Sequence, residues 1–113
     1  LKQRRNSRGG LSGGEQQMLA IARALIANPS TIILDEPSEG LAPSIVSRLV
    51  DILEQLKRDG IGILLVEQDF RIAARIADTI YIQQAGLVVF QGSGLSESDV
   101  ASEIEKTMNL QAG

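Results

Sequence analysis

Two adjacent carboxylates, Asp35 and Glu36, directly follow the apolar run Ile32–Leu34 in this 113-residue sequence. Two negative charges at the end of a buried strand are costly unless a positive group compensates them. Mg²⁺ bound together with nucleotide phosphates would do so, because this ion takes one or two carboxylates and completes its shell with phosphate and water oxygens. The neighbouring acid could then orient or deprotonate an attacking water. The pair alone is also compatible with a solvated turn after the strand.

A second candidate site is the stretch LSGGE at residues 11–15, which lies immediately ahead of a helix-like run. Ser12 and Glu15 fit a capping box, in which each side chain satisfies a backbone N–H of the first turn. Gly13 and Gly14 cost stability in a helical turn, but they allow another molecule to approach the backbone closely. Because free N–H groups at a helix N-terminus bind anions, phosphate is the expected guest. The stretch is either only a cap, or a phosphate contact that is also capped.

The composition limits the other chemistry that is available. The chain contains no histidine and no cysteine, which excludes catalytic triads, imidazole bases, disulfides and thiolate metal sites. Its net charge of −3 gives no general electrostatic reason to bind nucleic acid or an anionic membrane. Basic residues near the N-terminus are interpreted as a solvated helix end: Lys2, Arg4, Arg5 and Arg8. No apolar run is long enough to span a membrane.

The hydrophobic pattern predicts the elements that position these residues. Apolar residues recur at helical spacing after the glycine pair, and Asn28–Pro29 ends that helix. The runs TIILDE and IGILLVE are short and continuously apolar, which is typical of strands buried on both faces of a parallel sheet. Between them, Pro43 begins a helix that reaches about Arg58, with Gly60 as its C-cap.

The C-terminal half contains a predicted hairpin between two helices. Asp69 can cap a short helix, and strands are expected near 79–83 and 87–91, around Ala85–Gly86. A final amphipathic helix over about 97–110 carries Val100, Ile104 and Met108. This order of elements predicts an α/β fold with a parallel sheet and an antiparallel hairpin. In such sheets ligands bind beyond the carboxyl ends of the strands, where the sequences DEP and EQD follow the two apolar runs.

An ordered set of motifs now resembles the ATP-binding subunits of ABC transporters. LSGGE at 11–15 matches the signature motif of the family, and Ile32–Glu36 matches its Walker B strand. The sequence SEGLAP occupies the D-loop, and Val66–Asp69 fall on the switch segment, or H-loop. The resemblance covers residues 1–92 and is nearest to the ATPases of branched-chain amino acid importers, with urea importers as near relatives. It implies the C-terminal part of a P-loop NTPase (RecA-like) domain.

The resemblance also implies roles for individual residues. In the family, two subunits enclose two ATP molecules, and the signature motif of one subunit covers the γ-phosphate held by the other. That motif comprises Ser12, Gly13, Gly14 and Glu15 here. Asp35 would coordinate Mg²⁺ through water, and Glu36 would be the general base for water that attacks the ATP held by its own subunit. The D-loop would couple the two sites through Ser38, Glu39, Gly40, Leu41 and Ala42.

The sequence departs from the family at three places. The switch position usually holds histidine; Gln68 can hydrogen-bond a γ-phosphate or orient water, but it carries no positive charge. The usual D-loop aspartate is Ala42, which removes one polar contact across the dimer. The phosphate loop G-x-x-x-x-G-K-[ST] is absent, as is the Q-loop, and in the family both lie upstream of the signature. We therefore expect this chain by itself to be inactive.

The expected organisation is one partial ATPase domain. Residues 1–28 would form the end of the helical subdomain with the signature motif and the following helix, residues 29–92 the strands and helices of the catalytic core, and residues 93–113 the C-terminal helix. Because the chain opens with Leu1 in a basic stretch, we expect it to be cut from a longer protein. Without the strands that flank TIILDE in the family, one sheet edge would stay open to pairing.

The full-length protein is expected to be an importer ATPase at the cytoplasmic face of the cell membrane. It would use ATP and Mg²⁺ to power the uptake of branched-chain amino acids or a related small solute. Its expected partners are a second ATPase subunit, identical or different, transmembrane permease subunits and, indirectly, a periplasmic or extracellular solute-binding protein, but no nucleic acid. Two alternatives stay open: a non-catalytic fragment that pairs with a complete ATPase, and a soluble ATPase of the same superfamily.

Overall fold

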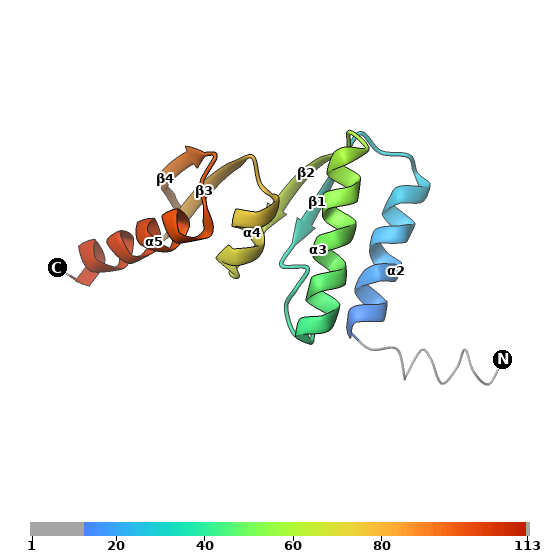
Figure 1. Ribbon diagram of the computed structural model, residues 1–113, viewed down its shortest axis with the longest axis horizontal. Helices are drawn as coiled ribbons and strands as arrows, with labels where there is room; N and C mark the ends of the chain where they lie inside the picture. Colours follow the sequence, from blue (N-terminus) through green and yellow to red (C-terminus); the bar gives the residue numbers. More distant parts are fainter. Residues whose placement is uncertain (1–12, 113) are drawn as a thin grey trace. The chain divides into compact units, whose positions relative to one another are not determined.

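The structure is a computed structural model that describes residues 13–112 (Figure 1). Helices and strands follow one another in the order that the hydrophobic pattern predicts. They are α2 (Gly13–Ile26), β1 (Thr31–Asp35), α3 (Pro43–Arg58), β2 (Gly62–Val66), α4 (Phe70–Ile76), β3 (Thr79–Gln84), β4 (Leu87–Ser93) and α5 (Glu97–Ala112). The chain divides after Val66 into two compact units.

The first unit is built on a parallel pair of strands. β1 and β2 pair with Thr31 opposite Gly62 and Asp35 opposite Val66. The carboxyl ends of the two strands therefore lie at the same edge. Figure 1 shows α2 and α3 side by side, with both strands next to α3. This arrangement confirms the predicted parallel sheet.

The strands are buried on one face only, so the prediction of strands buried on both faces is wrong. Ile32 is 5% exposed, whereas its neighbour Ile33 is 71% exposed. Leu64, which lies opposite Ile33, is 56% exposed, and Val66 is exposed on the same face. Alternate residues of a strand point to opposite faces. A continuous apolar run shows that both faces can be buried, but within the described residues the helices cover only one.

α3 supplies most of the core of the first unit. Its buried residues are Leu49, Val50, Leu53 and Leu56. The helix ends in a Schellman motif, in which the N–H groups of Gly60 and Ile61 donate to the carbonyl oxygens of Lys57 (3.0 Å) and Leu56 (3.1 Å). Gly60 has a φ of +87°, which glycine adopts without steric cost. The predicted stop signal is thereby confirmed.

The second unit begins with a capped helix that leads into the hairpin. The carboxylate of Asp69 accepts a hydrogen bond from the backbone N–H of Arg71 at 3.1 Å, which confirms the predicted N-cap of α4. β3 and β4 pair antiparallel, as predicted. Between them, Ala85 and Gly86 both have positive φ values, +53° and +80°, as in a type I′ turn.

The core of the second unit is formed where α4, α5 and the hairpin provide apolar side chains. Its buried residues are Ile72, Ile76, Ile80 and Val100. Met108, which the sequence pattern assigns to the same amphipathic helix as Val100, is 56% exposed. The reason is length: α4 has seven residues, about two turns, and α5 has sixteen. No helix in the described part of the chain is long and apolar enough to cross a bilayer.

Candidate nucleotide site

The two carboxylates lie at the carboxyl end of the parallel sheet. Asp35 is the last residue of β1 and is exposed, and Glu36 follows it and is half-buried. The backbone N–H of Glu36 donates to the carbonyl oxygen of Val66 at 2.7 Å, one residue beyond the end of β1. The hydrogen bond ties the acid pair to the end of β2. This edge is where open parallel sheets bind their ligands.

Glu36 has a left-handed backbone conformation that the sequence did not reveal. Its φ is +49°, a region that few residues other than glycine and asparagine adopt. The conformation is held on both sides: the N–H of Glu36 is bound to Val66, and its carbonyl oxygen accepts from the N–H of Glu39 at 3.1 Å. Pro37, between them, is buried. Strained residues that their surroundings fix in this way gather at functional sites.

The loop after the acid pair leads directly into α3. The N–H of Leu41 donates to the carbonyl oxygen of Ser38 at 3.1 Å, in a turn that contains Gly40 with a φ of +75°. Ala42 is the N-cap of α3, and its carbonyl oxygen accepts from the N–H of Ile45 at 2.9 Å. Its methyl group can accept no hydrogen bond from the helix. The residue that differs from the family therefore also leaves α3 without a side-chain cap.

Gly13 and Gly14 form the first turn of α2, here called the glycine turn, which packs against the beginning of α3. Gly14 is buried, and a Cβ placed on it would overlap Cγ2 of Ile45. A Cβ on Gly13 would lie 3.3 Å from Cδ2 of Leu41. The close approach of two helices is therefore by itself a sufficient reason for glycine at position 14. The sequence suggested a different reason, access for a ligand. Ser12, and with it the predicted capping box with Glu15, lies outside the described residues.

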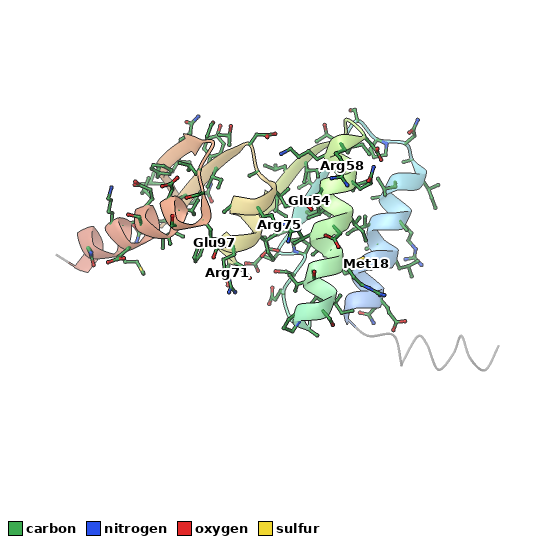
Figure 2. The ribbon with its side chains drawn as sticks, viewed as in Figure 1. Met18, Glu54, Arg58, Arg71, Arg75 and Glu97 are labelled. Carbon is green, nitrogen blue, oxygen red and sulfur yellow. The ribbon has the colours of Figure 1, made fainter. Side chains whose placement is uncertain are left out.

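Gln68 belongs to the second unit, where it is exposed just before the N-cap of α4. The neighbouring Asp69 accepts hydrogen bonds from the backbone N–H and from Nε of Arg71, both at 3.1 Å. The side-chain hydrogen bond from Arg71 is the main reason why the pKa of Asp69 lies below its usual value, against the opposing effect of burial. Figure 2 shows Glu97 near Arg71, whose pKa is raised first by Asp69 and more weakly by Glu97.

The number of carboxylates in the acid pair, Asp35 and Glu36, limits the kind of metal site that it can form. Among residues 13–112, no group of three or more acidic residues could hold a metal ion. Asp35 and Glu36 supply at most two carboxylates. Mg²⁺ bound with a nucleotide takes its remaining oxygens from phosphates and water. The donor set therefore fits a nucleotide-bound Mg²⁺ better than an ion that the described residues hold alone.

A groove of about 420 Å³ lies elsewhere in the first unit, between α2 and β1. Its lining is mostly apolar and consists of Gln17, Ala20, Ile21, Ala24, Pro29 and residues 31–34. None of the predicted site residues lines it. The groove is therefore separate from the candidate site, which lies at the strand ends and the glycine turn.

Comparison with known proteins identifies relatives over most of the chain. The family model described as ABC transporter matches residues 1–39. The high-affinity branched-chain amino acid transport ATP-binding protein BraG of Pseudomonas aeruginosa is 48% identical over 95 residues, 83% of this chain and 41% of the relative. The lipopolysaccharide export system ATP-binding protein LptB of Haemophilus influenzae is 40% identical over 83 residues, 74% of this chain and 34% of the relative. The chain thus spans less than half the length of these relatives.

Solved structures of ATP-binding cassettes are also similar to this chain. MJ1267, an ATP-binding cassette of an ABC transporter, has a TM-score of 0.76 and 29% identity, with 91% of this chain and 40% of the other covered. A dimeric post-hydrolysis structure of the cassette MJ0796, bound to ADP and Pi, has a TM-score of 0.65 and 32% identity, with 73% and 35% covered. The predicted fold class and the predicted resemblance are both confirmed.

Proposed function

We propose that this chain, which belongs to the ABC transporter ATPases by sequence and fold, forms part of two composite ATP sites in an importer. Its acid pair would serve the ATP bound by its own subunit, and its glycine turn would serve the ATP of a second subunit. The observation that carries the proposal is the acid pair at the carboxyl end of a parallel sheet, in a chain 48% identical to BraG over 95 residues.

Glu36 is the proposed general base. Its carboxylate would accept a proton from the water that attacks the γ-phosphate, which requires the base to lie within hydrogen-bond reach of that water. The hydrogen bonds to Val66 and Glu39 support this role, because they fix the backbone from which the carboxylate extends. Asp35 would hold Mg²⁺ through water, and the ion would neutralise charge on the phosphates. Gln68 would hydrogen-bond the γ-phosphate or orient the water.

The glycine turn is the proposed contact across the dimer. The first N–H groups of an α-helix have no intrahelical partner, and together with the helix dipole they favour a bound phosphate. Ser12, Gly13, Gly14 and Glu15 would present such groups to ATP on a second ATPase subunit, identical or different. The residues from Ser38 to Ala42 would pass the same loop of the partner and couple the two sites.

The transported solute is proposed from the relatives. BraG is named for branched-chain amino acid transport, whereas LptB is named for lipopolysaccharide export. The higher identity to BraG favours a branched-chain amino acid or a related small solute. The full-length protein would bind permease subunits at the cytoplasmic face of the membrane and would work with a solute-binding protein indirectly. No nucleic-acid partner is proposed.

The test is Glu36→Gln in a full-length cassette that carries this sequence. The variant should bind ATP, lose steady-state hydrolysis and accumulate as an ATP-dependent dimer, which light scattering after gel filtration would detect. Glu105→Gln is the matched control, because Glu105 is an exposed glutamate of α5 outside the proposed sites. Hydrolysis by Glu36→Gln at the rate of the control would remove Glu36 from its role as base.

A further inference from the structure

We propose that Ile45, in the first turn of α3, positions the glycine turn of α2 and thereby the N–H groups that would contact phosphate. Ile45 touches no nucleotide in this proposal and acts through Gly14. The consequence for ATP binding rests on the proposed function, whereas the contact itself does not. Leu41 has a weaker role of the same kind, through Gly13.

The contact between Gly14 and Ile45 leaves no room for adjustment. A Cβ on Gly14 would overlap Cγ2 of Ile45 and would also lie 3.1 Å from Cγ1 and 3.2 Å from Cβ. A β-branched residue in a helix has one strongly preferred side-chain rotamer, and its Cβ is fixed to the backbone. Relief would therefore require movement of one helix relative to the other. The position of Ile45 consequently sets how closely the start of α2 can approach α3.

The contact at Gly13 differs in kind. Its nearest neighbour is the Cδ2 atom of Leu41, 3.3 Å from the position of a Cβ. This atom is the end of a flexible side chain, which can turn aside by a few tenths of an ångström. Gly13, which is exposed, is therefore a matched control for the buried Gly14, since alanine adds the same methyl group to the same helical turn at both positions.

Ile45 also lies in the first turn of α3, which follows the loop after the acid pair. Its N–H donates to the carbonyl oxygen of Ala42, and the N–H of Glu39 donates to the carbonyl oxygen of Glu36. Short hydrogen-bonded turns thus connect the end of β1 to the first turn of α3, in which Ile45 contacts Gly14. Within one chain, a shift of the loop that serves one proposed ATP site would move the glycine turn that serves the other.

A double-mutant cycle on the full chain, measured by thermal unfolding, tests the contact between Gly14 and Ile45. Gly14→Ala should lower Tm by several degrees, whereas Gly13→Ala should not lower it. The loss in Gly14→Ala is expected although alanine favours a helix over glycine by about 1 kcal/mol. Gly14→Ala/Ile45→Ala removes the obstructing Cγ1 and Cγ2 atoms of Ile45, so the double variant should be more stable than the sum of the two single effects predicts. Additive effects, or equal Tm values for the two glycine variants, would overturn the contact.

A distance measurement tests positioning without reference to function. The chain has no cysteine, so Gln16→Cys with Ser47→Cys gives a single pair of spin labels on exposed positions of α2 and α3. Gly14→Ala should move the distance distribution to longer values, and adding Ile45→Ala should return it toward the original. An unchanged distribution in Gly14→Ala would show that Ile45 contributes to stability but does not position the turn.

The consequence for nucleotide is measured in the full-length cassette with Glu36→Gln. Ile45→Ala should raise the ATP concentration needed for half-maximal dimerisation several-fold. Ile52→Ala is its control, because Ile52 is also a half-buried isoleucine of α3. Equal effects of the two variants would overturn the positioning role. Failure of the reference cassette to dimerise with ATP would instead overturn the proposed function, and the distance measurement would still decide the inference.

Discussion

The backbone N–H of Glu36 donates a 2.7 Å hydrogen bond to the carbonyl oxygen of Val66. This bond joins the acid pair after β1 to the last residue of β2, and the segment that carries Gln68 begins directly after Val66 in the chain. It also forms part of the environment that holds Glu36 at a φ of +49°. The candidate base therefore owes its backbone position to the neighbouring strand.

The left-handed conformation of Glu36 predicts an unusual order of stability among its variants. Glu36→Gly should be more stable than Glu36→Ala by about 1 kcal/mol, because a Cβ is unfavourable at this φ. Both variants lose the carboxylate, so the comparison isolates the backbone. Urea unfolding of the chain measures the difference. Equal stability, or a more stable alanine variant, would show that the surroundings impose no cost at this position.

The missing cap of α3 predicts that a family-like residue stabilises the chain. Ala42→Asp should add about 1 kcal/mol to the free energy of unfolding, since aspartate at an N-cap accepts a hydrogen bond from the first turn. Thermal unfolding measures the gain. Ala42→Asn separates the cap from the charge, because asparagine is a comparable cap without the interaction with the helix dipole. If neither variant is more stable than the wild type, a side chain at position 42 does not cap α3, and the prediction is wrong.

The hydrogen bonds from Arg71 predict a pH dependence of stability. They lower the pKa of Asp69 in the folded chain below its ordinary value of 3.8, so the folded state binds this proton more weakly than the unfolded state. The contribution to stability is therefore present above the unfolded pKa and is lost as the pH falls through the folded one. Asp69→Asn, which keeps an acceptor, should be less stable than wild type at pH 7 and approach it at pH 3.

Chemical denaturation at both pH values measures that difference. Arg71→Met is the control background, because without the guanidinium the cost of Asp69→Asn should shrink already at pH 7. A cost of Asp69→Asn that does not change with pH would show that the carboxylate charge contributes nothing to the cap.

The absence of a phosphate loop predicts that the 113-residue chain by itself does not turn over ATP. Its sequence contains no G-x-x-x-x-G-K-[ST], the motif whose backbone N–H groups and lysine bind the phosphates of a nucleotide. Phosphate release with Mg²⁺ and ATP should stay at the level of a buffer blank, and calorimetry should detect no ATP binding in the micromolar range. Robust Mg²⁺-dependent turnover by the purified chain would contradict this account.

Local signals made much of the fold predictable. Pro43 and Gly60 mark the two ends of α3 by their own backbone preferences, and the observed helix runs between them. Gly86, between two runs of apolar residues, likewise marked the hairpin turn. Proline fixes φ and glycine permits positive φ, so in each case the residue type itself marks the boundary within a few positions and one sequence is sufficient to locate it.

Features that depend on distant parts of the chain were not predictable. The conformation of Glu36 is tied to a carbonyl oxygen of the other strand, and the need for glycine at position 14 arises from Ile45 on another helix. The exposure of Ile33 depends on which elements cover the sheet, which an apolar run does not reveal. For the candidate site, the motifs indicated which residues to consider, and their roles toward nucleotide stay predictions.

Within residues 13–112, one side of the β1–β2 sheet is left uncovered, which has a consequence for how the chain behaves in solution. Ile33, Leu64 and Val66 form an apolar surface there, which is bordered by the exposed carboxylate of Asp35 opposite Val66. Sulfate and phosphate salts strengthen the burial of such surfaces. Turbidity of the purified chain should therefore rise with protein concentration and with sulfate concentration, and Ile33→Lys should suppress both effects.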